Sequence, residues 1–211
     1  QEFNAPELTT IGKYAFAKSS LNQISVPKVT TIKSYAFQSS KIKKFNFENI
    51  EIIENNAFES SLLEGELSLA KVTTIGNDAF SNTKISGKVT ANNVISLGTT
   101  PFNKTKITEV EMNSLESLNS KAFKDLETLK KATFNRLTTI EDGASEAYLG
   151  TWGAFYNSGI QEFNAPELTT IGKYAFAKLK DVTKVSLRVP IGVKIAQNAF
   201  DSQDKYEIVQ P

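Results

Sequence analysis

The residues best suited to chemistry or recognition gather in one short stretch between Ile140 and Phe155. This stretch holds the only Trp of the chain, a Tyr and three acids: Trp152, Tyr148, Glu141, Asp142 and Glu146. Trp152 is a candidate recognition residue, because Trp is enriched at the hot spots of interfaces. It could also fold back and fill the space between two turns of the chain. The acids are candidate Ca²⁺ ligands, although their spacing matches no known cation-binding loop.

Histidine and cysteine are both absent from the chain. The lack of His removes the commonest general base and transition-metal ligand. The lack of Cys removes disulfides, thiolate metal sites and a thiol nucleophile. A Ser–Lys or carboxylate pair remains conceivable, but no spacing isolates one from the many other Ser, Lys and Glu residues. No glycine-rich phosphate-binding loop is present. We therefore expect no enzyme, no cofactor and no resident metal.

A repeat organises the rest of the chain. The segment QEFNAPELTTIGKYAFAK fills Gln1–Lys18 and recurs unchanged at Gln161–Lys178. Between these copies the same pattern returns in diverged form about every 21 residues. Its marker is an Ala-Phe pair, with Pro101 replacing Ala once, and the pairs close at Phe16, Phe37, Phe58, Phe80, Phe102, Phe123, Phe155, Phe176 and Phe200. The pattern predicts a solenoid in which each unit packs on its neighbours.

Each unit predicts one strand followed by a turn. The first half alternates apolar and polar residues, as in Leu21-x-x-Ile24-x-Val26, which is typical of a half-buried strand. The second half indicates a turn with a short helical or 3₁₀ piece. Extra residues beside Gly65 and Gly87 indicate β-bulges. The Phe residues share the phase of the aliphatic residues, which favours a buried Phe spine over an exposed stacking surface for bases or sugars.

The outward positions of the strands form a second candidate site. The central outward column is polar, and Asn46, Glu111 and Thr133 represent it. The column before it alternates in charge along Lys44, Glu66, Lys88, Glu109, Lys131, Glu162 and Lys184. Opposite charges on neighbouring strands would contribute about 0.2–1 kcal/mol per pair and would disfavour register slips. The face could dock a protein or glycan, or be a solvated, self-neutralised surface, since it lacks the aromatic residues that usually anchor interfaces.

The repeat resembles the leucine-rich repeats, through Leu-x-x-Ile-x-Val followed by apolar-x-x-Ile and Ala-Phe. Its Ala-Phe signature, as in residues 31–37, is similar to the BspA-like class found on bacterial and protist surfaces. The resemblance implies a curved repeat solenoid with a parallel β-sheet on the concave face and short turns or 3₁₀ pieces on the convex face. It also implies a secreted or surface-anchored protein, which in some members adheres to host matrix proteins or cells. The chain departs from the class in lacking Cys after Ala-Phe.

The amino-acid composition narrows the range of partners that the protein could bind. Lysine plus arginine total 24 against 23 acids, a net charge of +1, which argues against nucleic-acid binding. No run of eighteen apolar residues predicts a membrane span. The chain begins within a repeat and without an initiator Met. We therefore expect an excised or processed portion of a longer protein, present as a monomer.

Together these features predict one elongated domain over residues 1–211 with about nine repeats. We expect a ten-residue insertion near 142–151, with a short helical turn at Ser145–Leu149, and an irregular C-terminal repeat or cap at 185–211. The expected function is binding of a protein or glycan at the cell surface or outside the cell. The alternatives are a structural spacer that displays another domain, which the unchanged duplicate favours, and a glycan receptor that uses the inserted loop.

Overall fold

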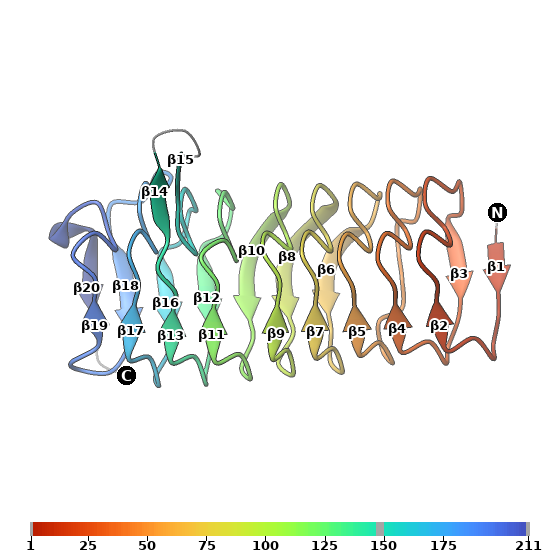
Figure 1. Ribbon diagram of the computed structural model, residues 1–211, viewed down its shortest axis with the longest axis horizontal. Helices are drawn as coiled ribbons and strands as arrows, with labels where there is room; N and C mark the ends of the chain where they lie inside the picture. Colours follow the sequence, from red (N-terminus) through yellow and green to blue (C-terminus); the bar gives the residue numbers. More distant parts are fainter. Residues whose placement is uncertain (1, 147–149, 210–211) are drawn as a thin grey trace.

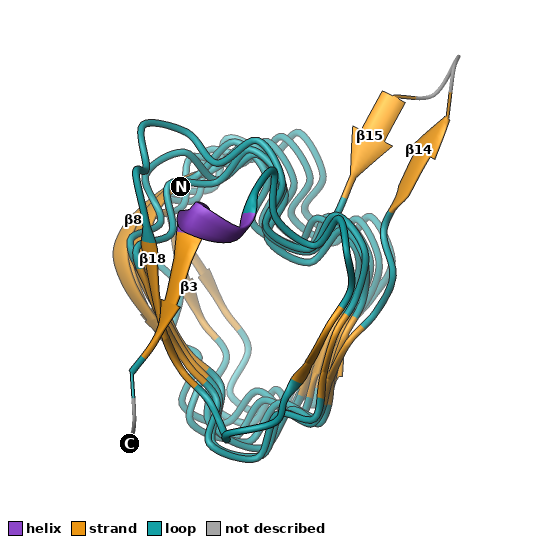
Figure 2. Ribbon diagram, turned by 90° about the vertical axis from the view of Figure 1, so that its left-hand side faces the viewer, coloured by secondary structure: helices purple, strands orange, loops and turns teal. Residues whose placement is uncertain are grey.

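The computed structural model describes residues 2–146 and 150–209 and is a parallel β-solenoid of about nine turns with almost no helix. The turns stack along one axis from the N-terminal to the C-terminal end (Figure 1). Viewed along that axis, the turns carry longer strands on one side and two-residue strands on another, joined by loops (Figure 2). The predicted solenoid with parallel strands is therefore confirmed.

The longer strands form a seven-stranded parallel sheet, which we call the long-strand sheet. Its strands, in spatial order, are β6 (Glu64–Ser68), β8 (Lys84–Thr90), β10 (Lys106–Glu111), β12 (Lys131–Thr133), β16 (Glu162–Asn164), β18 (Val185–Arg188) and β20 (Tyr206–Ile208). Two earlier strands, β1 (Glu2–Asn4) and β3 (Gln23–Ser25), pair only with each other within the described chain. Alternate residues along each strand point inward to the core, as the sequence pattern predicts.

The third unit departs from the prediction, because residues 43–47 form no strand. This unit has Phe at both inward positions, Phe45 and Phe47, whose rings lie 5.0 Å apart and both pack on Phe58. Other units with an inward Phe combine it with Ala, as in Ala132 and Phe134 of the seventh unit. We attribute the interruption to this excess volume, which disturbs regular pairing of the segment with the neighbouring strands.

The two-residue strands form a second set of parallel ladders. Five of them pair in one sheet: β2 (Thr10–Ile11), β4 (Thr31–Ile32), β5 (Ile52–Ile53), β7 (Thr74–Ile75) and β9 (Ser96–Leu97). Four continue in another: β11 (Ser117–Leu118), β13 (Thr139–Ile140), β17 (Thr170–Ile171) and β19 (Lys194–Ile195). The second residue of each strand is apolar and faces the core. We did not predict these strands, since two residues are too few to show an alternating pattern.

The Ala-Phe pairs lie in tight turns that follow the two-residue strands. In seven of the nine pairs the backbone N–H of the Phe donates to a carbonyl of the next coil, as from Phe37 to Ala57 at 2.7 Å and from Phe155 to Ala175 at 2.7 Å. This adds a third line of hydrogen bonds between coils. Short turns were expected here, and the only 3₁₀ helix among the described residues is η1 (Gln203–Lys205), just before β20.

The Phe column forms a buried spine, as predicted. Phe58, Phe80 and Phe102 are fully buried, and their rings stack at 5.5 Å with interplanar angles of 6° and 2°. A second stack runs from Phe123 through Phe155 and Phe176 to Phe200. These rings therefore belong to the core and are not available to bind bases or sugars.

The predicted bulges are also present. Gly65 and Gly87 have φ angles of +89° and +77°, which favour glycine. The pairing of β6 with β8 shifts register between Gly65 and Leu67, and that of β8 with β10 shifts opposite Gly87. The extra residues are thereby absorbed at one end of the strands, and the remainder of the long-strand sheet stays aligned.

The last unit has a different register from the one we expected. The sequence pattern aligned Lys184 with Glu162, but β18 pairs Ser186 with Glu162 and Arg188 with Asn164. The extra residues therefore lie before β18, where we had placed them after it. A shift of two residues keeps the same side chains facing inward, so hydrophobic alternation could not distinguish the two registers. Lys184 instead forms an ion pair with Glu207 of the adjacent strand β20, at 3.3 Å.

The insertion forms an antiparallel hairpin instead of the expected helical turn. Strands β14 (Ala144–Glu146) and β15 (Gly150–Trp152) pair with Ala144 opposite Trp152. The predicted turn at Ser145–Leu149 is thus wrong for Ser145 and Glu146, which lie in β14. Tyr148 lies outside the described residues. The hairpin extends from the corner of the solenoid, on the side away from the long-strand sheet (Figure 2).

Candidate functional site

The base of the hairpin is fixed to the next coil by two backbone contacts. The N–H of Gly143 donates to the carbonyl of Lys173 at 2.7 Å, and the N–H of Lys173 donates to the Asp142 carboxylate at 2.8 Å. A Cβ on Gly143 would lie 2.0 Å from the carbonyl oxygen of Trp152, so this close crossing requires glycine. Asp142, a predicted binding residue, therefore holds the base of the hairpin in place.

Trp152 lies half-buried at the end of β15, against the preceding coil. The Lys121 ammonium lies 4.5 Å from the centre of its indole ring, within the range of a cation–π interaction. Beside it, a Cβ on Gly153 would meet the Tyr174 carbonyl oxygen at 1.8 Å, so the backbones of these two coils touch. The indole is accordingly contacted by Lys121 of the preceding coil, with part of its surface open to solvent.

A second aromatic–lysine pair adjoins this one. Lys124 lies 5.8 Å from the ring centre of Tyr156, which is partly exposed and follows Trp152 around the same turn. We call Lys121, Lys124, Trp152 and Tyr156 the hairpin-base surface. We had not predicted Lys121, Lys124 or Tyr156. The repeat does contain a signal for Lys121. Lys121 precedes Phe123 by two residues and Trp152 precedes Phe155 by three, so the repeat places both on the same side of adjacent coils.

The acids of the insertion do not converge. Asp142 accepts the Lys173 N–H, Glu141 accepts a hydrogen bond from the Ser117 hydroxyl at 3.4 Å, and Glu146 is exposed on β14. Within residues 2–146 and 150–209, no group of three or more Asp or Glu residues could hold a metal ion. The described geometry gives the Ca²⁺ hypothesis no support.

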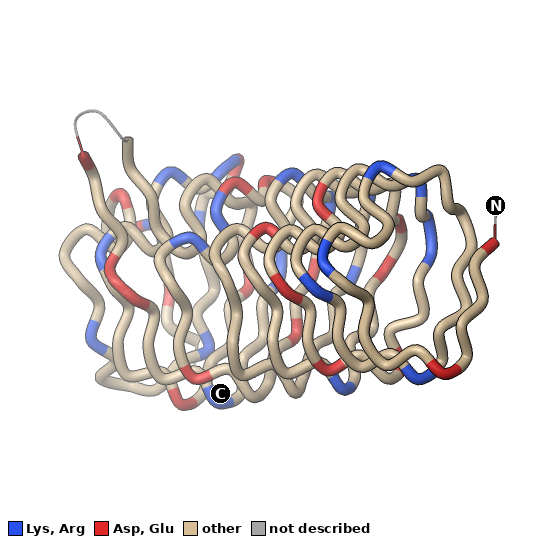
Figure 3. Tube along the Cα trace, turned by 45° about the vertical axis from the view of Figure 1, so that its right-hand side comes forward, with Lys and Arg blue, Asp and Glu red and all other residues tan. Residues whose placement is uncertain are grey.

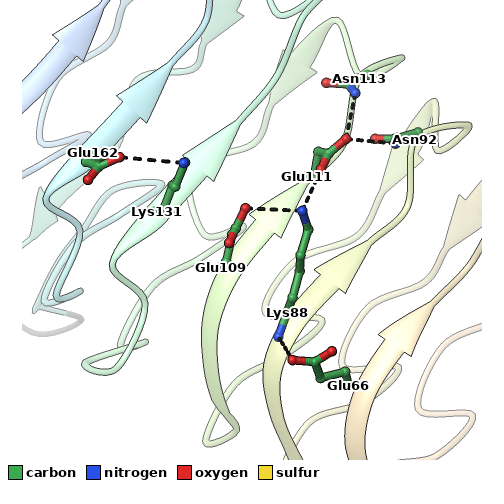
Figure 4. A network of polar contacts seen from close by, with 8 residues as sticks. All are labelled: Glu66, Lys88, Asn92, Glu109, Glu111, Asn113, Lys131 and Glu162. Carbon is green, nitrogen blue, oxygen red and sulfur yellow. Dashed lines mark hydrogen bonds and ion pairs between the residues drawn. The ribbon is translucent and has the colours of Figure 1, made fainter.

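On the outer face of the long-strand sheet, two steps of the predicted charge ladder form ion pairs, Lys88–Glu109 and Lys131–Glu162 (Figure 4). Among the described residues, the other predicted steps form none. Lys88 Nζ contacts Glu111 Oε2 at 2.8 Å and Glu109 Oε1 at 3.2 Å. Lys131 pairs with Glu162 at 3.7 Å. Positive and negative residues are interspersed over the rest of the solenoid as well (Figure 3). The ion pairs therefore neutralise part of this face.

Glu111 is the most engaged residue of that face. Its carboxylate accepts hydrogen bonds from Lys88, Asn92 at 3.0 Å and Asn113 at 3.1 Å. The Lys88 hydrogen bond, supported by the one from Asn92, holds the pKa of Glu111 below its ordinary value, and the same contact with Glu111 raises the pKa of Lys88. Glu111 is therefore charged and internally satisfied at neutral pH.

The remaining predicted residues of this face lie apart from one another. Asn46 belongs to the irregular third unit, where its side chain accepts the Glu48 N–H at 2.9 Å. Thr133 is aligned with Glu111 on the neighbouring strand, and it lines a groove of about 530 Å³ together with Asn164 and Arg188. The face is thus hollowed near its C-terminal end, and it is hollowed again around the irregular third unit, where Lys44, Asn46 and Glu66 line a second groove.

The fold defines a leucine-rich repeat solenoid, and comparison with known families agrees. The family model described as the BspA type Leucine rich repeat region matches in 6 copies, over residues 1–94, 66–148 and 151–210. The chain belongs to this family, as its Ala-Phe repeats predicted. Comparison with curated proteins gave no match, and neither did comparison with solved structures. Within the described residues, no helix is long and apolar enough to cross a membrane.

Proposed function

We propose that this protein is a non-enzymatic binding protein of the cell surface or extracellular space, and that it contacts a protein ligand through the hairpin-base surface. The proposal is supported by one observation above all. The hairpin β14–β15 is the segment that extends beyond the regular outline of the coils, and Trp152 lies at its base beside Lys121. Insertions of this kind in repeat proteins often carry the binding face.

The chemistry of the hairpin-base surface supports a protein ligand. Trp and Tyr present large apolar areas with few rotatable bonds, so they lose little entropy when they bind. Lys121 restrains the Trp152 ring before any partner arrives. A desolvated cation–π pair of this type contributes up to about 2 kcal/mol, so burial by a partner would strengthen the contact. The absence of His and Cys and the solenoid fold both support a binding role over catalysis.

Binding to purified matrix proteins and to immobilised glycans tests this proposal. Three variants make the test specific: Trp152→Ala, deletion of residues 145–151, and Tyr14→Ala. The deletion spares Asp142 and Gly143, which fix the hairpin base. Tyr14 is the matched control, because it is 51% exposed and packs under a lysine at the other end of the solenoid.

We expect the first two variants to bind a matrix protein at least about tenfold more weakly, as for a hot-spot Trp, and Tyr14→Ala to bind normally. Equal binding by all forms would refute the placement of the site. If only glycans bind and the loss follows Trp152, the glycan-receptor alternative is favoured. If no form binds any probe, the spacer that displays another domain becomes the better explanation.

A further inference from the structure

A row of hydrogen-bond donors with no side-chain partner among residues 2–146 and 150–209 crosses the C-terminal part of the long-strand sheet. The register aligns Glu111 with Thr133, Thr133 with Asn164 and Asn164 with Arg188 on four successive strands. The hydroxyl, the amide and the guanidinium therefore follow one another at the spacing of parallel strands, about 4.8 Å. Together they line the groove of about 530 Å³, which Val209 borders at its far end.

Arg188 differs from the three lysines of this face that form ion pairs. Among the described residues, Lys84 and Lys106 near the starts of β8 and β10 are likewise unpaired, but neither lines this groove. Lys88, Lys131 and Lys184 each contact a carboxylate, whereas no carboxylate among residues 2–146 and 150–209 lies within 4 Å of Arg188. Glu111, in the same row, is three strands away, or roughly 14 Å, which exceeds the screening length of about 8 Å at physiological salt. The negative charge of Glu111 is also already paired with Lys88.

The other charges of the groove leave it net positive. Glu162 lines the groove but is paired with Lys131, which lines it too. Glu207, on the adjoining strand, is held by Lys184 and by the Ser186 hydroxyl at 3.0 Å. Within the described part of the chain, one positive charge, that of Arg188, has no partner and lies beside two neutral groups that can donate hydrogen bonds.

We infer that this groove binds an acidic side chain of a protein partner, with Arg188 as the residue that receives the carboxylate. The planar guanidinium offers two parallel N–H donors that match the two oxygens of a carboxylate. Asn164 and Thr133, next along the row, donate to the same carboxylate or to a carbonyl of the partner backbone. The groove lies on the opposite side of the solenoid from the hairpin, so it is a second contact surface, independent of the hairpin-base surface (Figure 2).

The lining favours a peptide over an acidic sugar. Sugar sites generally present an aromatic ring to the apolar face of the sugar. The one aromatic residue of this groove, Phe163, is 1% exposed and belongs to the core. An extended acidic segment needs only a charge and hydrogen bonds at strand spacing, and both are present here.

The chain has only two arginines, Arg136 and Arg188, which permits a direct test. In a ¹H–¹⁵N spectrum of the labelled protein, the side-chain Nε–H groups give two signals, assigned with Arg136→Lys. Arg136 is an internal control, because its guanidinium is paired with Glu116 at 2.8 Å on another face. The probe is an acetylated, amidated hexaglutamate peptide, and hexaglutamine is its neutral control.

We expect hexaglutamate to shift the Arg188 signal saturably and to leave Arg136 unchanged. By fluorescence anisotropy of the labelled peptide, Arg188→Gln should weaken binding about fivefold, the upper range for an exposed ion pair. Glu162→Gln should strengthen binding, since it removes the negative charge of the groove. Equal shifts of both arginines would mean non-specific attraction and would overturn the inference, as would an unshifted Arg188 signal.

Two further experiments distinguish this groove from a sugar-binding site and from the hairpin-base surface. Polygalacturonate replaces the peptide in the first, and a response to it without a response to hexaglutamate would overturn the choice of a peptide ligand. The second experiment measures the binding of hexaglutamate to the Trp152→Ala variant. Its hexaglutamate binding should be normal, so that failure at the hairpin-base surface and failure at the groove remain distinguishable.

Discussion

The two identical 18-residue segments allow burial to be measured with local sequence held constant. Phe16 and Phe176 occupy the same position in Gln1–Lys18 and Gln161–Lys178. Phe176 is 1% exposed and lies between Phe155 and Phe200, at 5.0 and 4.8 Å. Phe16 is partly exposed in the first coil and stacks on one spine ring only, at 5.3 Å. Local propensity and nearby chain entropy are therefore matched in the two Phe→Ala variants.

The magnitudes follow from these environments. Deletion of a fully buried Phe side chain costs about 3–5 kcal/mol, and we expect Phe176→Ala to fall in this range. Each aromatic pair contributes about 0.5–1.5 kcal/mol beyond its buried area. Phe16 has one stacked neighbour fewer and remains partly hydrated, so we expect Phe16→Ala to cost roughly half as much. Phe80→Ala, in the fully buried centre of the spine, should match Phe176→Ala.

Urea unfolding, followed by far-UV circular dichroism, measures the free energy of unfolding of each variant. Because coils of a solenoid contact only their neighbours, amide hydrogen exchange should be recorded as well, to detect local opening of the first coil. Equal losses for Phe16→Ala and Phe176→Ala would refute the placement of the two copies at the end and in the interior. A loss below about 1 kcal/mol for Phe80→Ala would refute the buried spine.

Three further predictions concern single contacts. Gly172→Ala should lower the melting temperature, because a Cβ at this position would lie 2.5 Å from the Glu141 backbone. Gly12→Ala should not, because a Cβ there would meet nothing within 4 Å. Equal melting temperatures of the two variants would contradict this prediction. Glu111→Gln should reduce the free energy of unfolding at pH 7. The pKa of Glu111 in the folded state lies below its ordinary value of 4.5, so the carboxylate stabilises the fold fully above pH 4.5. The difference in free energy of unfolding between Glu111→Gln and wild type should vanish as the pH falls through the lowered pKa. A difference that persists at acidic pH would count against the ion pair. Lys121→Met should increase acrylamide quenching of Trp152 fluorescence, and unchanged quenching would argue against the cation–π contact.

The period of the sequence was sufficient to predict the buried spine and the bulges of the solenoid. One Phe per unit, in phase with the aliphatic residues, predicted the buried spine. Glycines beside single extra residues predicted the bulges at Gly65 and Gly87. These predictions succeeded because stacking repeats the same environment, so that several diverged units report on one structural position.

Apart from the two-residue strands, which are too short to show alternation, the features that escaped prediction depend on contacts between particular coils. The register of β18 was missed because a shift of two residues leaves the inward face unchanged. The interruption at residues 43–47 depends on the combined volume of Phe45 and Phe47 against the spine. The pattern of apolar residues treats both Phe residues as ordinary inward positions and contains no measure of volume.

The candidate site was predictable in location but not in composition. The break in the repeat drew attention to Trp152 and Asp142, and both lie at the base of the hairpin. Lys121 was missed because it belongs to a unit 32 residues before the insertion's Ala-Phe pair, and only the stacking of coils brings it over the indole. Arg188 was missed because its row depends on the corrected register of β18.

The most direct test of the proposed binding role uses Trp152 as the only tryptophan of the chain. Biosynthetic 5-fluorotryptophan would give a protein with one ¹⁹F signal, to which an unlabelled matrix protein adds none. We predict that titration with a matrix protein found to bind will shift or broaden this signal until saturation, at the concentration set by the affinity. Binding that leaves the ¹⁹F signal unchanged to saturation would contradict contact through the hairpin-base surface.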